Sequence, residues 1–83
     1  MRLPRDVSGA DLAHALRLLG YRVTRQTGSH LRLTTLERGE AHITIPQHNR
    51  LRVGTLAAIL ADVAEHFELS REELGARLFG SGR

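Results

Sequence analysis

The sequence predicts a two-layer α+β domain in which one helix precedes three antiparallel strands and two helices follow them. Apolar residues recur at helical spacing toward both ends of the chain, and in the middle they alternate with polar residues. Glycine-containing turns separate the alternating segments, as is typical of antiparallel hairpins. The chain has 83 residues, enough for one hydrophobic core and too few for two, so residues 1–83 are expected to form one domain.

The composition is that of a globular protein, with 41% hydrophobic and 25% charged residues. Cysteine is absent, so neither disulfides nor a cysteine-ligated zinc ion can stabilise the small core. Residues 1–6 lack the apolar stretch of a secretory signal, and the longest apolar run, residues 56–61, is too short to cross a membrane. We therefore expect a cytoplasmic protein with no membrane partner.

The first helix is predicted to begin at Ser8. Ser8 is a favourable N-cap, and Asp11 stands three residues later, where its carboxylate completes a capping box. Val7 is placed to pack against Leu12 across the helix start. Gly20 ends the helix, because a residue without Cβ adopts the left-handed C-cap conformation at low cost. The apolar positions between them follow helical spacing: Leu12, Ala15, Leu16 and Leu19.

Three strands are predicted in the middle of the chain. Alternation over residues 21–26, and again over residues 30–36 after a glycine turn, indicates a hairpin. A second turn at residues 37–39 leads to the third strand, residues 42–45. Pro46 stops this strand, because proline has no N–H to donate to a ladder.

Two helices are predicted in the C-terminal third. The first has Thr55 as its N-cap and the apolar series of a strongly amphipathic helix: Leu56, Ile59, Leu60, Val63, Ala64 and Phe67. The second is shorter and starts with a capping box formed by Ser70 and Glu73. It ends near Phe79, and residues 80–83 are expected to fray.

The strand alternation also predicts which face of the sheet the helices cover. The apolar side chains on the helix-facing side are Val23, Leu31, Leu33, Ile43 and Ile45. The opposite, solvent-facing side then carries Arg22, Thr24, Gln26, Arg32, Thr34, His42 and Thr44 and no acidic residue. The chain has 12 basic residues, all arginine, against 9 acidic ones. A basic face on one side of a sheet is expected of a nucleic-acid-binding protein.

His30 is the residue that most suggests chemistry. It follows the glycine turn at an exposed rim of the sheet, where an imidazole can exchange protons near neutral pH. If residues 37–39 form a three-residue turn, the apolar positions of the second and third strands pair and His30 lies opposite Pro46. The segment that carries His48 would then lie beside His30.

Two histidines on one rim can act as a general acid and a general base. Arg32, on the same strand as His30, could hold a phosphate while His30 and His48 move protons. These groups suffice for RNA cleavage by attack of the internal 2′-hydroxyl, with no metal and no cofactor. The alternative is that His30 is only the first residue of a strand and has no chemical role.

The remaining histidines are weaker candidates. His14 and His66 are expected on the solvated surfaces of the first and second long helices, and His66 suits the helix dipole at the C-terminus. His42 lies on the open face, two pairs away from His30. A metal site made of His30, His42 and His48 is conceivable, but it is not favoured because cysteine and a nearby acidic cluster are lacking.

Taken together, four motifs resemble the HicA family of toxins over most of the chain. Their combined spacing is far more specific than any one of them. They are Leu16-x-x-Leu19-Gly20-Tyr21, Arg25-Gln26-x-Gly28-Ser29-His30, Ile43-x-Ile45-Pro46-x-His48 and Gly54-Thr55-Leu56-x-x-Ile59-Leu60.

The resemblance implies a fold like the double-stranded-RNA-binding domain, a ribonuclease that cleaves messenger RNA, and a HicB antitoxin that masks the site. The essential histidine of the family falls on His30, and His48 matches the histidine after the family's Ile-Pro or Val-Pro pair. The residues expected to bind RNA are Arg22, Gln26, Ser29, Arg32, Thr34 and Thr44.

Two departures from the family pattern stand out. The helix expected over residues 70–79 extends beyond many short members, which leaves room for an added dimer or partner contact. Lysine is absent, which matters little because arginine binds phosphate at least as well.

Two other functions fit the same residues: a non-catalytic RNA-binding module that uses the basic face, and an interaction protein that binds an acidic partner.

Overall fold

The computed structural model describes residues 6–80 and has the predicted α+β architecture. Its elements in chain order are α1 (Gly9–Leu16), the 3₁₀ turn η1 (Arg17–Leu19), β1 (Arg22–Thr27), β2 (His30–Thr35), β3 (Ala41–Pro46), α2 (Val53–Phe67) and α3 (Arg71–Phe79). Two predictions concern residues that lie mainly outside the described range. They are the fraying of the C-terminal tail, mainly residues 81–83, and the lack of a signal segment, mainly residues 1–5.

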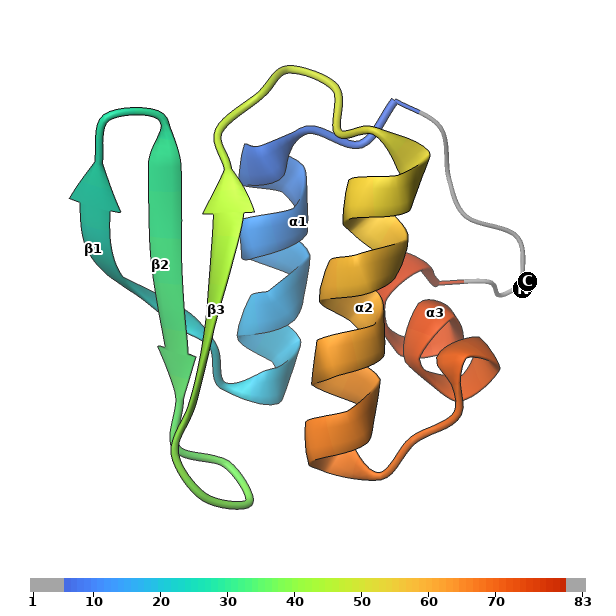
Figure 1. Cartoon of the computed structure of the whole chain (residues 1–83). Coiled ribbons are helices and arrows are strands. Elements are labelled where there is room, and N and C mark those ends of the chain that lie inside the picture. Colours follow the sequence, from blue (N-terminus) through green and yellow to red (C-terminus); the bar gives the residue numbers. More distant parts are fainter. Residues whose placement is uncertain (1–5, 81–83) are drawn as a thin grey trace.

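The three strands form one antiparallel sheet in the order β1-β2-β3, and the helices lie on one side of it (Figure 1). Both α1 and α2 contact the sheet, and α3 packs against these two helices on the side away from the sheet. No element of residues 6–80 covers the opposite face of the sheet. The element order and the antiparallel sheet are consistent with the double-stranded-RNA-binding type of fold.

The start of α1 has the predicted capping box. The Asp11 N–H donates to Ser8 Oγ at 2.9 Å, and the Ser8 N–H donates to the Asp11 carboxylate at 3.3 Å. Gly9 lies so close to the end of β3 that a Cβ atom there would collide with the Pro46 carbonyl oxygen. The helix ends as predicted before Gly20, whose φ of 83° is left-handed, although its last turn is the 3₁₀ turn η1.

The start of α2 differs from the prediction. Its N-cap is Arg52, which makes no side-chain hydrogen bond, and Thr55 lies inside the first turn. Leu51 is buried, and its N–H donates to the Val7 carbonyl at 2.7 Å. This long-range contact fixes the chain just before the helix. The helix therefore begins earlier than local capping preferences indicate, and Thr55 is not the N-cap.

The predicted capping box of α3 is confirmed. The Ser70 N–H donates to the Glu73 carboxylate at 2.8 Å, and the Glu73 N–H donates to Ser70 Oγ at 3.0 Å. Hydrogen bonds from the backbone and then from the side chain of Ser70 lower the pKa of Glu73, because they stabilise its charged form. Leu74 on the same helix is fully buried, which anchors α3 to the other two helices.

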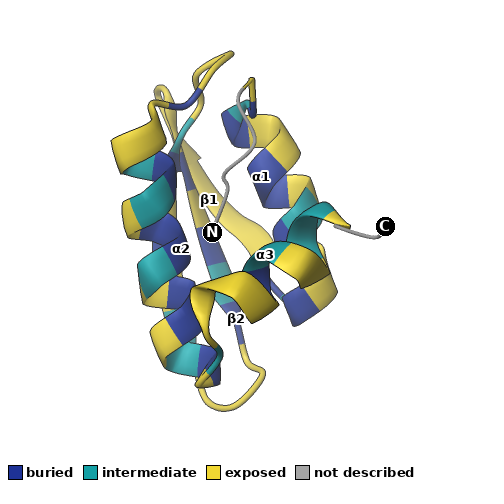
Figure 2. Ribbon diagram, turned by 90° about the vertical axis from the view of Figure 1, so that its right-hand side faces the viewer, coloured by how far each residue is buried: buried dark blue, intermediate teal, exposed yellow. Residues whose placement is uncertain are grey.

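The core lies between the sheet and the helices, where the buried stripes of α1 and α2 face the interior (Figure 2). Inward and outward residues alternate along β2 and β3 as predicted. The nine residues predicted to form one core are all buried: Leu31, Leu33, Ile43, Ile45, Leu56, Ile59, Leu60, Val63 and Phe67. Tyr21 joins them with a side chain that is almost fully buried, and this burial raises the pKa of its hydroxyl.

The strand β1 departs from the predicted pattern. All six of its residues are exposed, and Val23, which was expected against the helices, is 51% exposed. The pairing with β2 shifts between Val23 and Arg25, which marks a β-bulge at Thr24. Val23 does pair with Leu33 and so lies on the helix-facing side, but β1 is the outer strand and the helices leave half of Val23 uncovered (Figure 1).

The register of β2 and β3 is the predicted one. The pairs run from His30 opposite Pro46 to Thr35 opposite Ala41. Residues 36–40 connect the two strands, so β2 ends one residue before its predicted end at 36 and β3 begins one residue before its predicted start at 42. The three-residue turn predicted at residues 37–39 lies within this five-residue loop, and the register is unchanged.

We expect Ile59→Ala to lower the free energy of unfolding by about 2 to 5 kcal/mol, because it leaves a cavity under the sheet. Urea denaturation of the purified protein measures this change. Val53→Ala is the matched control, since Val53 lies on the same helix and is 60% exposed. An Ile59→Ala protein as stable as the parent would contradict the packing of α2 described above.

Candidate functional site

The open face of the sheet is built mainly by β2 and β3. Arg32 lies opposite Thr44, and Thr34 lies opposite His42. Cross-strand partners in an antiparallel sheet lie on the same face, so these four side chains share the side away from the helices. Arg32, His42 and Thr44 are exposed and Thr34 is partly so, as the alternation predicted.

The bulge changes what β1 adds to this face. Arg22 lies opposite Thr34 as expected, but Arg25 is now opposite Arg32 and so joins the open face. Gln26 is opposite Leu31, on the helix-facing side, so the predicted position of Gln26 on the open face is wrong. Strict alternation from Val23 would have aimed the charged Arg25 at the helices, and this conflict was the signal of a bulge in the sequence.

The displaced Gln26 has a contact of its own. Its side-chain Nε2 donates to Oε1 of Gln47 at 3.1 Å. This bond links the outer strand β1 to the segment that follows β3. Gln26 thus helps to position the rim of the sheet and does not line its open face.

A shallow pocket of about 420 Å³ lies on the open face at the end where β2 begins. No acidic residue lines it. Its walls are formed by Arg25, Thr27, His30, Arg32 and Thr44. Two guanidinium groups beside one imidazole make this pocket suitable for an anion such as a phosphate group.

His30 is the first residue of β2 and pairs with Thr27 across the hairpin. Gly28 opens the two-residue turn with a φ of 54°, a conformation that glycine adopts without strain. His30 is exposed, and its ring makes no hydrogen bond within residues 6–80. The imidazole is therefore available to a ligand.

His48 lies on the same rim. The Gln47 N–H donates to the Ser29 carbonyl at 2.6 Å, which ties the segment after β3 to the hairpin turn. The His48 carbonyl accepts the Gly9 N–H at 2.9 Å, which ties the same segment to the start of α1. The His48 side chain is exposed but is not among the residues that line the pocket beside His30.

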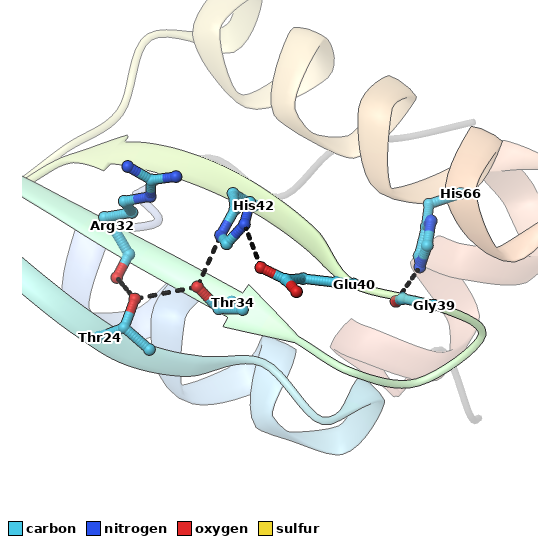
Figure 3. Close-up of polar contacts among 7 residues, drawn as sticks. All are labelled: Thr24, Arg32, Thr34, Gly39, Glu40, His42 and His66. Carbon is cyan, nitrogen blue, oxygen red and sulfur yellow. Dashed lines mark hydrogen bonds and ion pairs between the residues drawn. The ribbon is translucent and has the colours of Figure 1, made fainter.

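His42 occupies the other end of the open face, and both its ring nitrogens are engaged (Figure 3). Nε2 contacts the Glu40 carboxylate at 2.9 Å, and Nδ1 contacts the Thr34 hydroxyl at 2.8 Å. Thr34 in turn contacts the Thr24 hydroxyl at 2.9 Å. Because these contacts fix the ring, His42 is better suited to ordering the strands than to proton transfer. The Glu40 carboxylate also brings an acidic group to this end of the face.

His66 is not a simple surface residue, contrary to the prediction. Its Nε2 donates to the carbonyl groups of Glu37 at 2.9 Å and Gly39 at 3.2 Å, the latter drawn in Figure 3. Its ring packs edge-on against Phe67, with the ring centres 4.9 Å apart. His66 therefore fastens the loop between β2 and β3 to the C-terminal end of α2. His14 is exposed on α1, as predicted.

Within residues 6–80, no three His, Asp or Glu side chains are grouped as a metal ion would require. None of the helices of the described chain is long and apolar enough to span a membrane. The disfavoured trio of His30, His42 and His48 is not such a group, since His42 lies four residues along β3 from Pro46, the partner of His30.

The fold and the site define a class: a small α+β domain whose open sheet face suits a polyanion such as a nucleic acid. Residues 9–64 match a family model described as the HicA toxin of bacterial toxin-antitoxin, and the chain belongs to this family. It is thus the toxin of a toxin–antitoxin pair, and toxins of this family are typically ribonucleases. No significant match was found among curated proteins or among solved structures.

We expect His66→Ala to lower the free energy of unfolding by about 0.5 to 1.5 kcal/mol, because two backbone carbonyls lose their donor. Amide hydrogen exchange of Glu37, whose N–H donates to Thr35 Oγ1 at 3.1 Å at the start of this loop, should become faster, whereas His66→Gln, which keeps a donor, should restore part of the protection. His14→Ala is the matched control on an exposed histidine. Unchanged exchange in His66→Ala would show that this histidine does not hold the loop.

Proposed function

We propose that residues 1–83 form a single-domain endoribonuclease that cleaves messenger RNA in the cytoplasm with His30 as a catalytic residue. A HicB-type antitoxin neutralises it by covering the open face. The observation that supports this proposal most strongly is the environment of His30: among the described residues, its imidazole has no hydrogen-bond partner, and the pocket that it shares with Arg25 and Arg32 has no acidic lining. The family of the chain agrees with ribonuclease activity.

The chemistry that fits these groups is transfer of the phosphodiester to the neighbouring 2′-oxygen. A base removes the proton of the 2′-hydroxyl, the 2′-oxygen bonds to phosphorus, and the bond to the 5′-oxygen breaks as an acid supplies a proton to it. The products are a 2′,3′-cyclic phosphate and a free 5′-hydroxyl. Histidine is suited to both proton transfers because its charge changes near neutral pH. Nothing in this sequence of steps calls for a metal ion.

His30 carries out one of the two proton transfers, and His48 on the same rim is the candidate residue for the other. The support for His48 is the hydrogen bond between Gln47 and Ser29, which keeps the segment after β3 at the turn before His30. The guanidinium groups of Arg25 and Arg32 hold the phosphate and stabilise the charge that develops on it.

The remaining proposed binding residues are Thr44 in the pocket, Ser29 in the turn before His30, and two residues farther along the open face. The RNA contacts proposed beside Arg25 and Arg32 are Arg22, Ser29, Thr34 and Thr44. Gln26 is left out because it pairs with Leu31 on the covered side of the sheet. Since these groups are polar and exposed, an antitoxin that covers them excludes RNA from the pocket as well.

We expect His30→Ala to lower kcat for cleavage of a single-stranded RNA by roughly 10² to 10⁴, with little change in RNA affinity. His42→Ala is the control from the same face, and its kcat should stay close to that of the parent because both His42 nitrogens already have partners. Addition of EDTA should leave the parent rate unchanged. An RNA with 2′-deoxy sugars should bind and remain uncut.

Two outcomes would contradict this assignment. A folded His30→Ala protein that cuts RNA at the parent rate would show that His30 is not catalytic, and His48→Ala would then be the next variant to test. A parent protein that binds RNA and never cuts it would instead be a non-catalytic RNA-binding module.

We expect Arg32→Ala to weaken RNA binding and cleavage together, because a phosphate-holding cation acts in the ground state and in the transition state. The slope of log affinity against log salt concentration should fall by about 0.7 if one phosphate contact of a single strand is lost. Arg38→Ala is the control, since Arg38 lies in the loop between β2 and β3 and pairs with Glu68 at 3.4 Å. Equal slopes for the parent and Arg32→Ala would exclude Arg32 as a phosphate ligand.

A further inference from the structure

A second groove lies away from the pocket beside His30, at the place where η1, the start of β1 and α3 meet. Its volume is about 600 Å³. Four basic side chains line it, namely His14, Arg17, Arg22 and Arg77, beside apolar residues such as Leu18 and Leu78. The proposed cleavage chemistry does not use this groove.

The charges of this groove are only partly balanced by the described part of the chain: the Glu37 carboxylate lies at its edge beside Gly20, and the Glu73 carboxylate, one turn before Arg77 on α3, interacts with Arg77. No acidic residue lines the groove. Arg17, Arg22 and Arg77 form no ion pair within residues 6–80, whereas Arg38 pairs with Glu68 and Arg50 pairs with Asp6. Three guanidinium groups from three separate elements line this one groove, so an anion bound between them would reduce their mutual repulsion.

Arg22 connects the groove to the open face of the sheet. On β1 it lies opposite Thr34, and Thr34 is four residues from His30 along β2. At about 3.3 Å per residue, Thr34 and its partner Arg22 are roughly 13 Å along the strands from His30. A smaller groove of about 310 Å³, lined by Arg17 and Arg22 among others, continues along the same edge. Basic side chains thus occur from the pocket on the open face, through Arg22 on β1, to Arg77 on α3, with Glu37 beside Arg22.

We propose that this groove binds the phosphate backbone of the RNA at nucleotides several positions away from the cleaved bond. This inference rests on the proposed function, because it concerns the same RNA. A polyanion is favoured over an acidic protein segment because basic side chains occur from the groove, through Arg22, to the pocket of His30. Arg77 lies on α3, outside the residues 9–64 that match the family model.

The test compares RNA substrates of two lengths. One is a single strand of about 12 nucleotides, within the usual range of single-strand binding sites. The other is a ribodinucleotide whose single phosphate is the one that is cleaved. In Arg77→Ala, KM for the longer RNA should rise about two- to fivefold, the effect of losing one exposed ion pair, with kcat unchanged. The ribodinucleotide cannot reach the groove, so its kcat/KM should not change.

Arg71→Ala is the matched control, because Arg71 is exposed on the same helix, carries the same charge and does not line the groove. Its KM for both substrates should equal that of the parent. The double variant Arg17→Ala/Arg77→Ala should raise KM for the longer RNA further and lower the salt slope by about 1.4, or about 0.7 per contact. All of these positions are exposed, so circular dichroism should show parent-like folding.

Several results would overturn the inference. They are an unchanged KM for the longer RNA in Arg77→Ala, an equal effect of Arg71→Ala, or a loss that also affects the ribodinucleotide. Unchanged RNA binding together with weaker binding of the antitoxin would assign the groove to a protein partner instead.

If the parent cuts no RNA, the proposed function fails. Fluorescence anisotropy of the longer RNA with the same variants would still test the groove.

Discussion

The pairing of β2 with β3 is the interaction on which the rest of the structure depends. On the inner side it brings Leu33 and Ile45 under the helices, where both are fully buried. Because successive side chains point to opposite faces, the same register presents Arg32 and Thr44 to solvent. A slip of one residue would bury Arg32 and expose Leu33, so the free energy of core burial also fixes the composition of the open face. Stability and site geometry therefore have one common origin.

The rim of the sheet is held by a small number of backbone contacts between distant segments. The segment after β3 donates from Gln47 to the hairpin turn, accepts from Gly9 at the start of α1, and donates from Leu51 to the residues before α1. Gly9 permits this approach because it has no Cβ to meet the Pro46 carbonyl. These contacts hold the turn before His30 and the segment of His48 on the same side of the molecule. A helix start, a hairpin turn and a loop are thus joined where the chemistry is proposed.

Hydrogen bonding separates the histidines into two groups. His42 and His66 use their ring nitrogens to fasten strands and a loop, and these contacts make them parts of the fold. His30 has no such partner within residues 6–80 and lines a pocket with two arginines. Residue type and position along a strand were similar for His30 and His42, yet their surroundings differ. An imidazole whose nitrogens are free can bind a substrate and exchange its proton, whereas one held by Glu40 and Thr34 is already occupied.

The sequence by itself determined the elements whose causes are local. The capping boxes of α1 and α3 involve residues three apart, the helical stripe of α2 repeats within one segment, and the alternation of β2 and β3 depends on neighbouring positions. The register, the core and the place of His30 on the rim followed from these patterns. The bulge that exchanges Gln26 for Arg25 on the open face had a local signal in the charge of Arg25. Only the tertiary structure decided the start of α2 after Leu51 and the contact of His66 with the loop. Each of these depends on residues far apart in the chain, whose approach is set by the packing of the whole domain and is not encoded in any short segment.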